Sequence, residues 1–383
     1  MSNDTRPEIR FPGFTEDWEE RKLGELTESF DGKRVPIDSD LRISGKYPYY
    51  GATGIIDYVD DYIFNGEYVL LAEDGANIIM RNYPVAYLTQ GKFWLNNHAH
   101  IMRMRNGSNY FLVQVLEKID YKKYNTGTAQ PKLNSKIVKN IELKIPHIEE
   151  QQQIGNFFKQ LDDIIALHQR KLDLLKETKK GFLQKMFPKN GAKVPEIRFP
   201  GFTEDWEQRT LGDILKEFSI KSKVENEYTV LSSTNSGMEI RNGRVSGVSN
   251  LGYKIIENGD LVLSPQNLWL GNININNVGT GLVSPSYKTF KFIKVDPGFI
   301  RPQLRTARML EEYKNSSTQG ASVVRRNLEL GSFYQITIKI PSDVEQGKIG
   351  LFFKQLDNLI ALHQRKLDLL KETKKGFLQK MFV

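Results

Sequence analysis

Two histidines flank one alanine at His98-Ala99-His100, a spacing that could place two imidazole ligands on one metal ion. A metal site needs further ligands, and no cluster of carboxylates adjoins this pair in the sequence. Contact with a base or a phosphate, or packing within a strand, are the alternatives. We therefore predict no metal site and keep His98 as a candidate nucleic-acid contact.

Other catalytic patterns are missing or weak. The sequence has no glycine-rich P-loop and no Asn/Asp-Pro-Pro-aromatic motif of the kind found in nucleobase methyltransferases; Gly279-Thr280-Gly281 and Ser284-Pro285-Ser286-Tyr287 are the nearest approaches. Glu142-Leu143-Lys144 has the Glu-x-Lys form of some nucleases, but its apolar alternation before Pro146 indicates a strand. We expect a chain that is not itself a catalyst.

Basic and amide side chains interleaved with aromatic ones form a more persuasive set. Arg and Lys suit guanine edges and phosphates, and Asn and Gln suit adenine edges. Each residue alone also fits a solvated loop, but the set lies on two separate blocks of sequence. The candidate DNA contacts are Lys33, Arg34, Tyr49, Tyr50, Asn77, Arg81, Asn96, Asn97, His98, Gln130 and Lys132 in the first block, and Ser233, Thr234, Asn235, Arg241, Arg244, Gln266, Asn267, Trp269, Arg325 and Arg326 in the second.

An internal duplication frames these two blocks. Residues 157–187 and 352–382 are identical except that Asp163 becomes Asn358 and Ile164 becomes Leu359, and a tag, PEIRFPGFTEDWE, occurs at 7–19 and at 195–207. The blocks between them, roughly 20–148 and 208–343, agree mainly at their edges. The chain is therefore a duplicated scaffold that carries two different inserts.

The duplicated segments have the apolar period of coiled-coil helices. In the first copy the seam steps by alternating fours and threes, with His168 and Lys179 as polar interruptions: Ile154, Phe158, Leu161, Ile165, His168, Leu172, Leu175, Lys179, Phe182 and Met186. About 31 residues make a rod of roughly 46 Å. Matching seams in one chain favour mutual pairing over two unrelated surface helices, and a pseudo-two-fold relation would make the pair antiparallel.

The two blocks are predicted to be α+β globules. Short apolar runs such as Tyr68–Leu71 and Asp260–Leu263 are bounded by turn signals and indicate strands. The predicted fold is α+β, with two globular α/β domains separated by two long antiparallel coiled-coil helices. The predicted segments are 1–148, a first globular domain with its tag; 149–187, a first long helix; 188–207, a linker and second tag; 208–343, a second globular domain; and 344–383, a second long helix.

Composition narrows the class further. The chain of 383 residues has a formal charge of +8, a weak sign of an anionic partner, and no cysteine, which excludes disulfides and thiolate metal sites. No stretch approaches the roughly 18 apolar residues of a membrane span, and the first residues lack the pattern of a signal peptide. We expect a soluble, cytoplasmic protein with no membrane partner.

The layout resembles the specificity (S) subunit of type I restriction–modification enzymes. The likeness covers nearly the whole chain: two dissimilar recognition domains, two near-identical helical regions, and the pairs Glu150-Gln151 and Glu345-Gln346 before the helices. The stretches Tyr47–Ile55 and Asn96–His100 also look like recognition-domain sequence of that family.

The resemblance implies a sequence-specific reader of double-stranded DNA. Each recognition domain would read one half of a bipartite site, and the helices would set the spacer and dock two modification (methyltransferase) subunits. The cofactors would lie on partners: S-adenosylmethionine on the modification subunits, and ATP with Mg on restriction subunits that join for cleavage. Candidate docking residues on the helices are Arg170, Lys180, Arg365 and Lys375.

Two other classes remain open. Duplicated helices could join two different protein-binding domains in a scaffold that never meets DNA. A standalone DNA enzyme is a weaker third reading because no catalytic motif is present. Salt-dependent binding to duplex DNA separates the specificity subunit from the scaffold.

Overall fold

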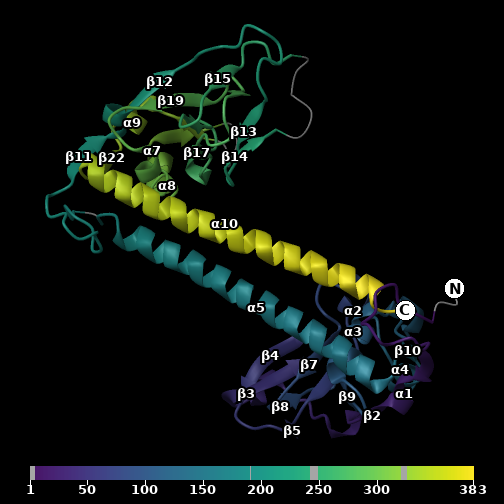
Figure 1. Cartoon of the computed structure of the whole chain (residues 1–383). Coiled ribbons are helices and arrows are strands. Elements are labelled where there is room, and N and C mark those ends of the chain that lie inside the picture. Colours follow the sequence, from purple (N-terminus) through teal and green to yellow (C-terminus); the bar gives the residue numbers. More distant parts are fainter. Residues whose placement is uncertain (1–4, 190, 242–248, 321–325) are drawn as a thin grey trace. The chain divides into compact units, whose positions relative to one another are not determined.

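A computed structural model describes residues 5–189, 191–241, 249–320 and 326–383 (Figure 1). The chain divides into two compact units: Met1–Arg170 with Gln364–Val383, and Lys171–His363. The predicted segments follow chain order, whereas each unit combines one globular domain with parts of both long helices. Within the part of the chain described, no helix has the length and apolar content needed to cross a membrane.

The two predicted long helices are present as α5 (Ile148–Lys185) and α10 (Asp343–Lys380). Both start shortly after a proline and carry acidic residues in the first turn, where they favour a helix N-terminus. The predicted seam is confirmed by burial, because the side chains on this face are removed from water: Ile154, Phe158, Leu161 and Leu172 in α5, and Ile349, Phe353 and Leu367 in α10.

Within each unit the two helices run antiparallel. In the first unit the rings of Phe157 and Phe377 lie 5.0 Å apart, and Lys374 Nζ is 2.6 Å from Asp162. In the second unit Phe182 and Phe352 repeat the ring contact at 5.0 Å, and Lys179 lies 2.5 Å from Asp357. The pairs in each unit ascend on α5 as they descend on α10, so the antiparallel prediction is confirmed. The lysine that interrupts each predicted seam is held by an aspartate of the other helix.

The duplicated tags fasten the helix ends to the domains. Arg10 makes two hydrogen bonds of 2.6 and 2.7 Å to the fully buried carboxylate of Glu150, and Ile9 N donates to Lys380 O at 2.9 Å. The second tag repeats this arrangement, because Arg198 binds Glu345 at 2.7 and 2.8 Å. In the adjoining position Gln151 donates to the carbonyl of Pro146. The repeated Glu-Gln pairs therefore anchor the tag and begin the helix.

The first domain contains two four-stranded sheets. Its central sheet has the order β2-β9-β6-β7, its second sheet β4-β3-β8-β5, and β1 pairs with β10. The strands are β1 (Glu19–Lys22), β2 (Thr27–Ser29), β3 (Ser44–Gly51), β4 (Gly54–Val59), β5 (Phe64–Asn65), β6 (Tyr68–Ala72), β7 (Ala86–Thr89), β8 (Lys92–Leu95), β9 (Ala99–Met104) and β10 (Glu142–Ile145). The helices are α1 (Leu23–Leu26), η1 (Asp31–Lys33), η2 (Ser39–Leu41), α2 (Asn77–Met80), α3 (Asn109–Lys118), η3 (Tyr121–Tyr124) and α4 (Ser135–Lys139).

The sequence of β6 is apolar throughout because both faces of the strand are buried. Val69 and Leu71 belong to a core cluster with residues of α3, whereas Leu70 points the other way and packs with Phe64 and Phe93 of the second sheet. Successive side chains of a strand alternate between faces, so a strand covered on both faces has no polar positions. The central sheet is thus the middle layer of the domain.

The second domain repeats the central sheet with different surroundings. Its order β12-β19-β16-β17 matches β2-β9-β6-β7. The strands are β11 (Glu207–Thr210), β12 (Leu215–Phe218), β13 (Leu231–Ser233), β14 (Met238–Ile240), β15 (Lys254–Ile256), β16 (Leu261–Leu263), β17 (Ile273–Ile275), β18 (Gly281–Val283), β19 (Lys288–Phe292), β20 (Ser317–Gln319), β21 (Arg326–Leu328) and β22 (Thr337–Ile340). The helices are α6 (Leu211–Ile214), η4 (Leu268–Leu270), α7 (Pro297–Ile300), α8 (Ala307–Asn315) and α9 (Leu330–Tyr334).

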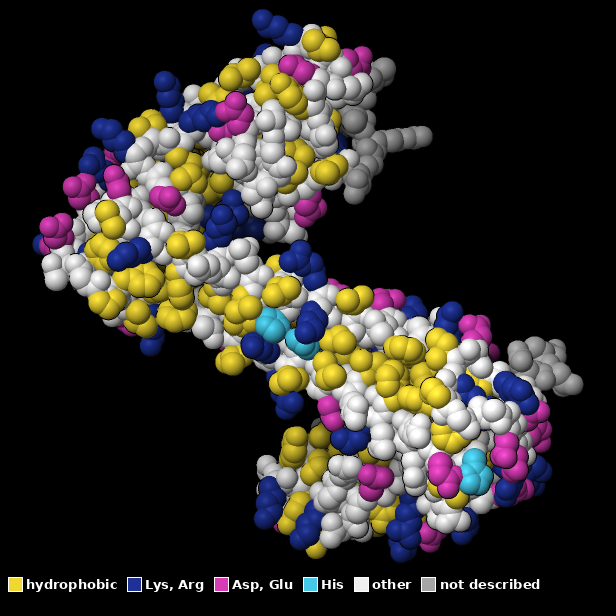
Figure 2. Space-filling view, viewed as in Figure 1, with side chains coloured by type: hydrophobic (Ala, Val, Ile, Leu, Met, Phe, Trp, Pro, Cys, Tyr) yellow, Lys and Arg dark blue, Asp and Glu magenta, His cyan; other side chains and the backbone are white. Residues whose placement is uncertain are grey.

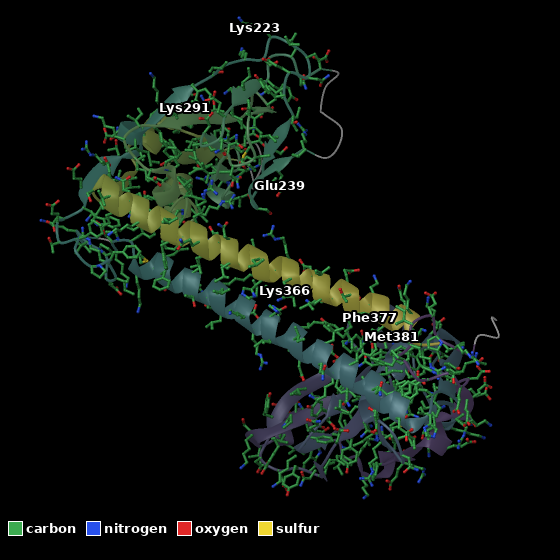
Figure 3. The ribbon with its side chains drawn as sticks, in the orientation of Figure 1. Lys223, Glu239, Lys291, Lys366, Phe377 and Met381 are labelled. Atoms are coloured by element: carbon green, nitrogen blue, oxygen red, sulfur yellow. The ribbon has the colours of Figure 1, made fainter. Side chains whose placement is uncertain are left out.

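The ends of the long helices belong to the domain cores. Figure 3 labels Phe377 and Met381 at the C-terminal end of α10, where Met381 joins the main core cluster of the first domain and Phe377 packs against it. Met186 and Phe187, at the end of α5, have the equivalent place in the second domain. Burying one such side chain contributes roughly 1.5–3 kcal/mol. Each domain is therefore built around its helices and not merely attached to them.

Candidate nucleic-acid interface

Three chain segments meet at one end of the middle strands of the central sheet in the first domain, where β6 ends and β9 begins. We call this place the edge of the sheet. Strands β6 and β9 are antiparallel, so the end of β6 and the start of β9 lie at the same edge. Glu73 N donates to His98 O at 2.9 Å, and Leu133 N donates to Glu73 O at 2.7 Å. The segment 125–134 therefore lies against the loops that leave β6 and enter β9.

This edge gathers several of the predicted DNA contacts. Asn97, His98, Gln130 and Lys132 are exposed there, and Lys33 is exposed in η1. The ring Nδ1 of His98 lies 2.9 and 3.0 Å from the two carboxylate oxygens of Asp74, which fix its orientation. Exposed amides, one imidazole and lysines can together approach both base edges and phosphates.

Arg34 is a correction to the predicted set. Its Nη1 lies 2.6 Å from Glu73 Oε2 and 2.8 Å from the carbonyl oxygen of Ala99, and its side chain is only 13% exposed. The guanidinium is thus occupied inside the domain, where it supports the loop after β6. It is not available as a free contact to a base.

Tyr49 and Asn96 are also structural in this fold. The ring of Tyr49 is buried under the guanidinium of Arg42, and its hydroxyl accepts a 2.9 Å hydrogen bond from Ile37 N. Asn96 is buried and accepts from His98 N at 2.8 Å. Tyr50 is half-buried, and its ring stacks on Tyr87 with centroids 5.9 Å apart. Burial raises the pKa of the Tyr50 hydroxyl.

Asn77 and Arg81 hold the short helix α2 and the loop after it. Asn77 accepts from Tyr83 N and donates to Tyr83 O, at 2.8 and 2.9 Å. Arg81 has a left-handed backbone with φ of 57° and contacts Glu117 with its side chain. These bonds shape the local loop. Arg81 remains exposed on the side that does not contact Glu117, and a ligand would have to bind it there.

The sequence interpretation considered His100 only as a metal ligand, a base or phosphate contact or a packed strand residue, and it did not single out Asp31 and Glu73 beneath this edge. His100 is buried, and its Nδ1 lies 2.8 Å from Asp31 Oδ2 while its Nε2 lies 2.7 Å from Leu133 O. Glu73 completes the group 3.7 Å from the same Nδ1. Burial works to raise the pKa of Asp31, but the hydrogen bond and charge of His100 and the bond from Ile101 N hold that pKa below its usual value. No signal along the chain links residues this far apart.

In the second domain, Ser233 and Thr234 belong to a polar cluster with Asn274 and Arg305. Arg305 Nη2 donates to Thr234 O at 2.9 Å and to Asn274 Oδ1 at 2.5 Å, and Asn274 Nδ2 donates to Ser233 Oγ at 2.8 Å. Ser233 is buried, so its hydroxyl serves this cluster, whereas the neighbouring Asn235 is exposed. The sequence interpretation had missed Arg305, whose pKa burial lowers.

A second group of predicted residues meets at the edge of the sheet. Arg326 N donates to Gln266 O at 3.3 Å, which brings the β20–β21 hairpin beside the loop after β16. Gln266 is exposed there, and Asn267 and Trp269 are half-buried. Arg241 is also half-buried, and its backbone N donates to Val230 O at 3.0 Å beside β13. Arg326 turns its side chain to Ser317, with Nε 2.9 Å from the hydroxyl oxygen. Arg244 and Arg325 lie outside the described residues.

The two edges are equivalent positions of one frame. Leu71 pairs with His100 across β6 and β9, and Leu263 pairs with Lys288 across β16 and β19. The loop after β6 in the first domain, and the loop after β16 in the second, each contact a segment from the C-terminal third of the same domain. The two domains thus present different side chains at the same edge of the same sheet.

The candidate docking residues of the helices are all exposed: Arg170, Lys180, Arg365 and Lys375. Apolar side chains accompany them on the helix surface (Figure 2). The first unit exposes Ile164, Leu167 and Leu369, and the second exposes their repeat counterparts Leu359, Leu362 and Leu174. Each unit therefore exposes a matching set of apolar side chains, whereas Arg170, Arg365 and Lys375 belong to the first unit and Lys180 to the second.

Across residues 5–189, 191–241, 249–320 and 326–383, no group of three or more His, Cys, Asp or Glu side chains is placed to hold a metal ion. The described arrangement is that of a recognition protein with two unlike α/β heads on a duplicated helical frame.

Comparison with known proteins identifies the family of this chain. The family model of the type I restriction modification DNA specificity domain matches residues 15–177 and 203–372, so the chain belongs to this family. It is a DNA-specificity chain of the type I class, and the resemblance seen in the sequence is confirmed.

Individual relatives agree with this assignment. The chain is 24% identical over 401 residues to a type I restriction enzyme specificity subunit of Methanocaldococcus jannaschii, covering 94% of this chain and 91% of that one. It is 35% identical over 167 residues to a putative specificity subunit of Haemophilus influenzae, where the match covers 43% of this chain and 42% of the relative. The fold is similar to the crystal structure of a type I S subunit from M. genitalium, with a TM-score of 0.71, 15% identity and 99% of both chains covered.

Proposed function

We propose that each domain reads one half of a bipartite site in double-stranded DNA. The observation that carries this proposal is the pair of equivalent sheet edges with different polar side chains. His98, Gln130 and Lys132 lie at the first edge and Gln266 at the second. A shared frame with unlike side chains at one place suits two readers that approach DNA alike but recognise different bases.

The helices are the proposed docking surface for two modification subunits. A partner that binds both halves in the same way needs the same surface twice, and near-identity is confined to the helices and tags. Each surface combines exposed leucines with lysine or arginine, as protein interfaces with an apolar centre and a polar rim do. The scaffold alternative, without DNA, has no comparable support from the family.

The helices are also the proposed ruler of the spacer between the half-sites. Each of α5 and α10 has 38 residues, which corresponds to about 57 Å of helix axis. One turn of DNA is about 34–36 Å, so helices of this length exceed one turn. The distance between half-sites would then depend on helix length.

Catalysis and its cofactors are assigned to the partners. The modification subunits would bind S-adenosylmethionine and methylate adenine, and restriction subunits would use ATP and Mg. This assignment is supported by the family and by the lack of cofactor motifs in the sequence. The purified chain alone is expected to show no methyltransferase, nuclease or ATPase activity; activity that co-purifies with the chain through every step would contradict this.

A methylation map tests the function directly. Cells that carry the chain with its modification subunits should methylate one bipartite sequence, and deleting the chain should abolish those marks. The purified chain should bind duplexes with that sequence, and its affinity should fall steeply as salt rises. Marks that persist without the chain, together with binding that ignores both sequence and salt, would favour the scaffold alternative.

A further inference from the structure

His100 occupies an unusual position for an ionisable side chain. It lies in β9, where it is 1% exposed, and both of its ring nitrogens face oxygen atoms. Nδ1 is 2.8 Å from Asp31 Oδ2, and Nε2 is 2.7 Å from the carbonyl oxygen of Leu133. A neutral imidazole donates from one nitrogen only, while an imidazolium donates from both.

Both partners of His100 accept hydrogen bonds, so the ring must be the donor in each contact. A backbone carbonyl can only accept a hydrogen bond, so Nε2 must carry a proton. Asp31 Oδ1 accepts from Ile101 N at 2.9 Å, and a carboxylate that receives such bonds stays ionised. Nδ1 must then carry the second proton. Satisfying both contacts therefore requires the charged ring.

Among the buried groups around the ring, the charges balance with this proton. The groups that face His100 are Asp31 from η1, Glu73 from the loop after β6, Arg34 from the end of η1, and Lys132 from the segment 125–134, at the rim. Arg34 lies 2.6 Å from Glu73, and Lys132 is 3.5 Å from it. Lys132 is 47% exposed, so water screens its charge. Among the buried groups, two carboxylates against one guanidinium leave one negative charge, which the imidazolium neutralises. An unbalanced buried charge is costly.

The segment 125–134 is bonded to this ring and to the loop after β6. Leu133 follows Lys132 directly, and its carbonyl oxygen is the atom that Nε2 binds. The same segment carries the exposed Gln130 and Lys132 to the edge of the sheet. We propose that His100, held as an imidazolium, is the positioning residue for this segment, so that reading of the first half-site requires its charge; this inference rests on the proposed function.

The second domain supplies a matched control within the same chain. The position equivalent to His100 is Lys288, which pairs with Leu263 on β16 as His100 pairs with Leu71 on β6. Lys288 Nζ lies 2.7 Å from Glu217, and both side chains are about one-third exposed. Lys288→Gln is therefore the matched control for a substitution of His100.

The protonation state is tested without DNA. The full chain labelled with nitrogen-15 in its five histidines gives ring signals that single substitutions at His98, His147, His168 and His363 assign by elimination. His100 is expected to show two ring N–H protons, both slow to exchange with water because the ring is buried. A neutral ring with one N–H at neutral pH would overturn the proposal whatever the chain binds.

The positioning role is tested with the DNA site determined by methylation mapping. Duplexes with the first or the second half-site scrambled measure discrimination at each half. His100→Gln should weaken discrimination at the first half-site by roughly tenfold, equal to about 1.4 kcal/mol, and leave the second unchanged. Lys288→Gln should leave discrimination at the first half-site intact.

Contrary outcomes separate the two proposals. Equal loss at both half-sites, or no loss in His100→Gln, would overturn the role of His100 while DNA reading stands. An equal loss at the first half-site in His98→Gln, with Leu133 and its neighbours still in place, would assign the effect to the exposed His98–Asp74 pair and would also overturn it. If no sequence-specific DNA binding is found, the proposed function fails, and the nitrogen-15 spectrum still decides the state of His100.

Discussion

Asp31 is one carboxylate on which the buried network beneath the first recognition edge depends. Its pKa lies below the usual value because the bonds from His100 and Ile101 outweigh the effect of burial, so its ionised form is favoured in the folded state. A group with a lowered folded-state pKa contributes stability above its unfolded pKa and loses it as the pH falls through its folded pKa. The first domain should therefore weaken on acidification.

Replacement of Asp31 tests this at the scale of one residue. Asp31→Asn should lower the free energy of unfolding of the first domain by about 1–3 kcal/mol at neutral pH, since it loses a charged hydrogen-bond acceptor. The variant should then lose less additional stability in acid than the wild type. Native-state hydrogen exchange at Ile101 N measures both effects. Asp57→Asn, at a 43% exposed side chain paired with Arg42, is the control, and equal acid slopes in wild type and Asp31→Asn would contradict the argument.

The helix surfaces are the elements that should govern assembly. Reversing the charge of Arg170, Lys180, Arg365 and Lys375 to glutamate should weaken binding of the modification subunits by at least roughly tenfold, because exposed charges at an interface rim steer and hold a partner. Lys180 has only a 3.6 Å contact with Glu177, so these changes disturb little of the fold. Titration calorimetry with the purified subunit is the measurement.

A control variant separates this effect from general charge. Lys223→Glu changes an exposed lysine of the second domain, labelled in Figure 3, and should leave assembly unaffected. Unchanged affinity in the variant with all four reversals would show that the partner binds elsewhere, or that the apolar residues such as Leu167 and Leu362 carry the whole interaction.

Helix length is the second prediction at this scale. Four residues inserted into α5 between Leu175 and Lys179 add about 6 Å and about 1.1 turns, so the seam nearly keeps its face. The spacer should widen by one or two base pairs, at about 3.4 Å each, without change to either half-site. Two inserted residues turn the seam by more than half a turn and should damage folding. A methylation map with an unchanged spacer in an active four-residue variant would show that the helices do not set the distance.

At the scale of the whole molecule, the two recognition domains should be exchangeable modules. The first block starts and ends on paired strands, with Glu19 opposite Ile145, and the second repeats this with Glu207 opposite Ile340. The ends of each insert therefore lie side by side on the frame. Replacing 20–148 with another recognition domain of the family should change one half-site, and replacing 208–343 should change the other. A methylation map in which one swap alters both halves would refute this independence.

The sequence by itself determined the features that repeat at short range. The seams of α5 and α10 follow from a period of 3.5, the strand β6 follows from an unbroken apolar run between turn signals, and the duplication is visible in the sequence itself. The roles of the side chains at the recognition edge could not be determined in this way. The structure places His98 at the surface but Arg34, Tyr49 and Asn96 inside the domain.

Only the tertiary structure decided which polar residues are free. Arg34 meets Glu73 across 39 positions of sequence, and His100 meets Asp31 across 69. Whether a side chain points to DNA or into a buried ion pair depends on what the fold brings beside it, and periodicity carries no record of such distant partners. The helical frame is encoded locally because helices are stabilised by neighbours three and four residues apart, whereas the recognition edge exists only where strands and loops distant in sequence come together.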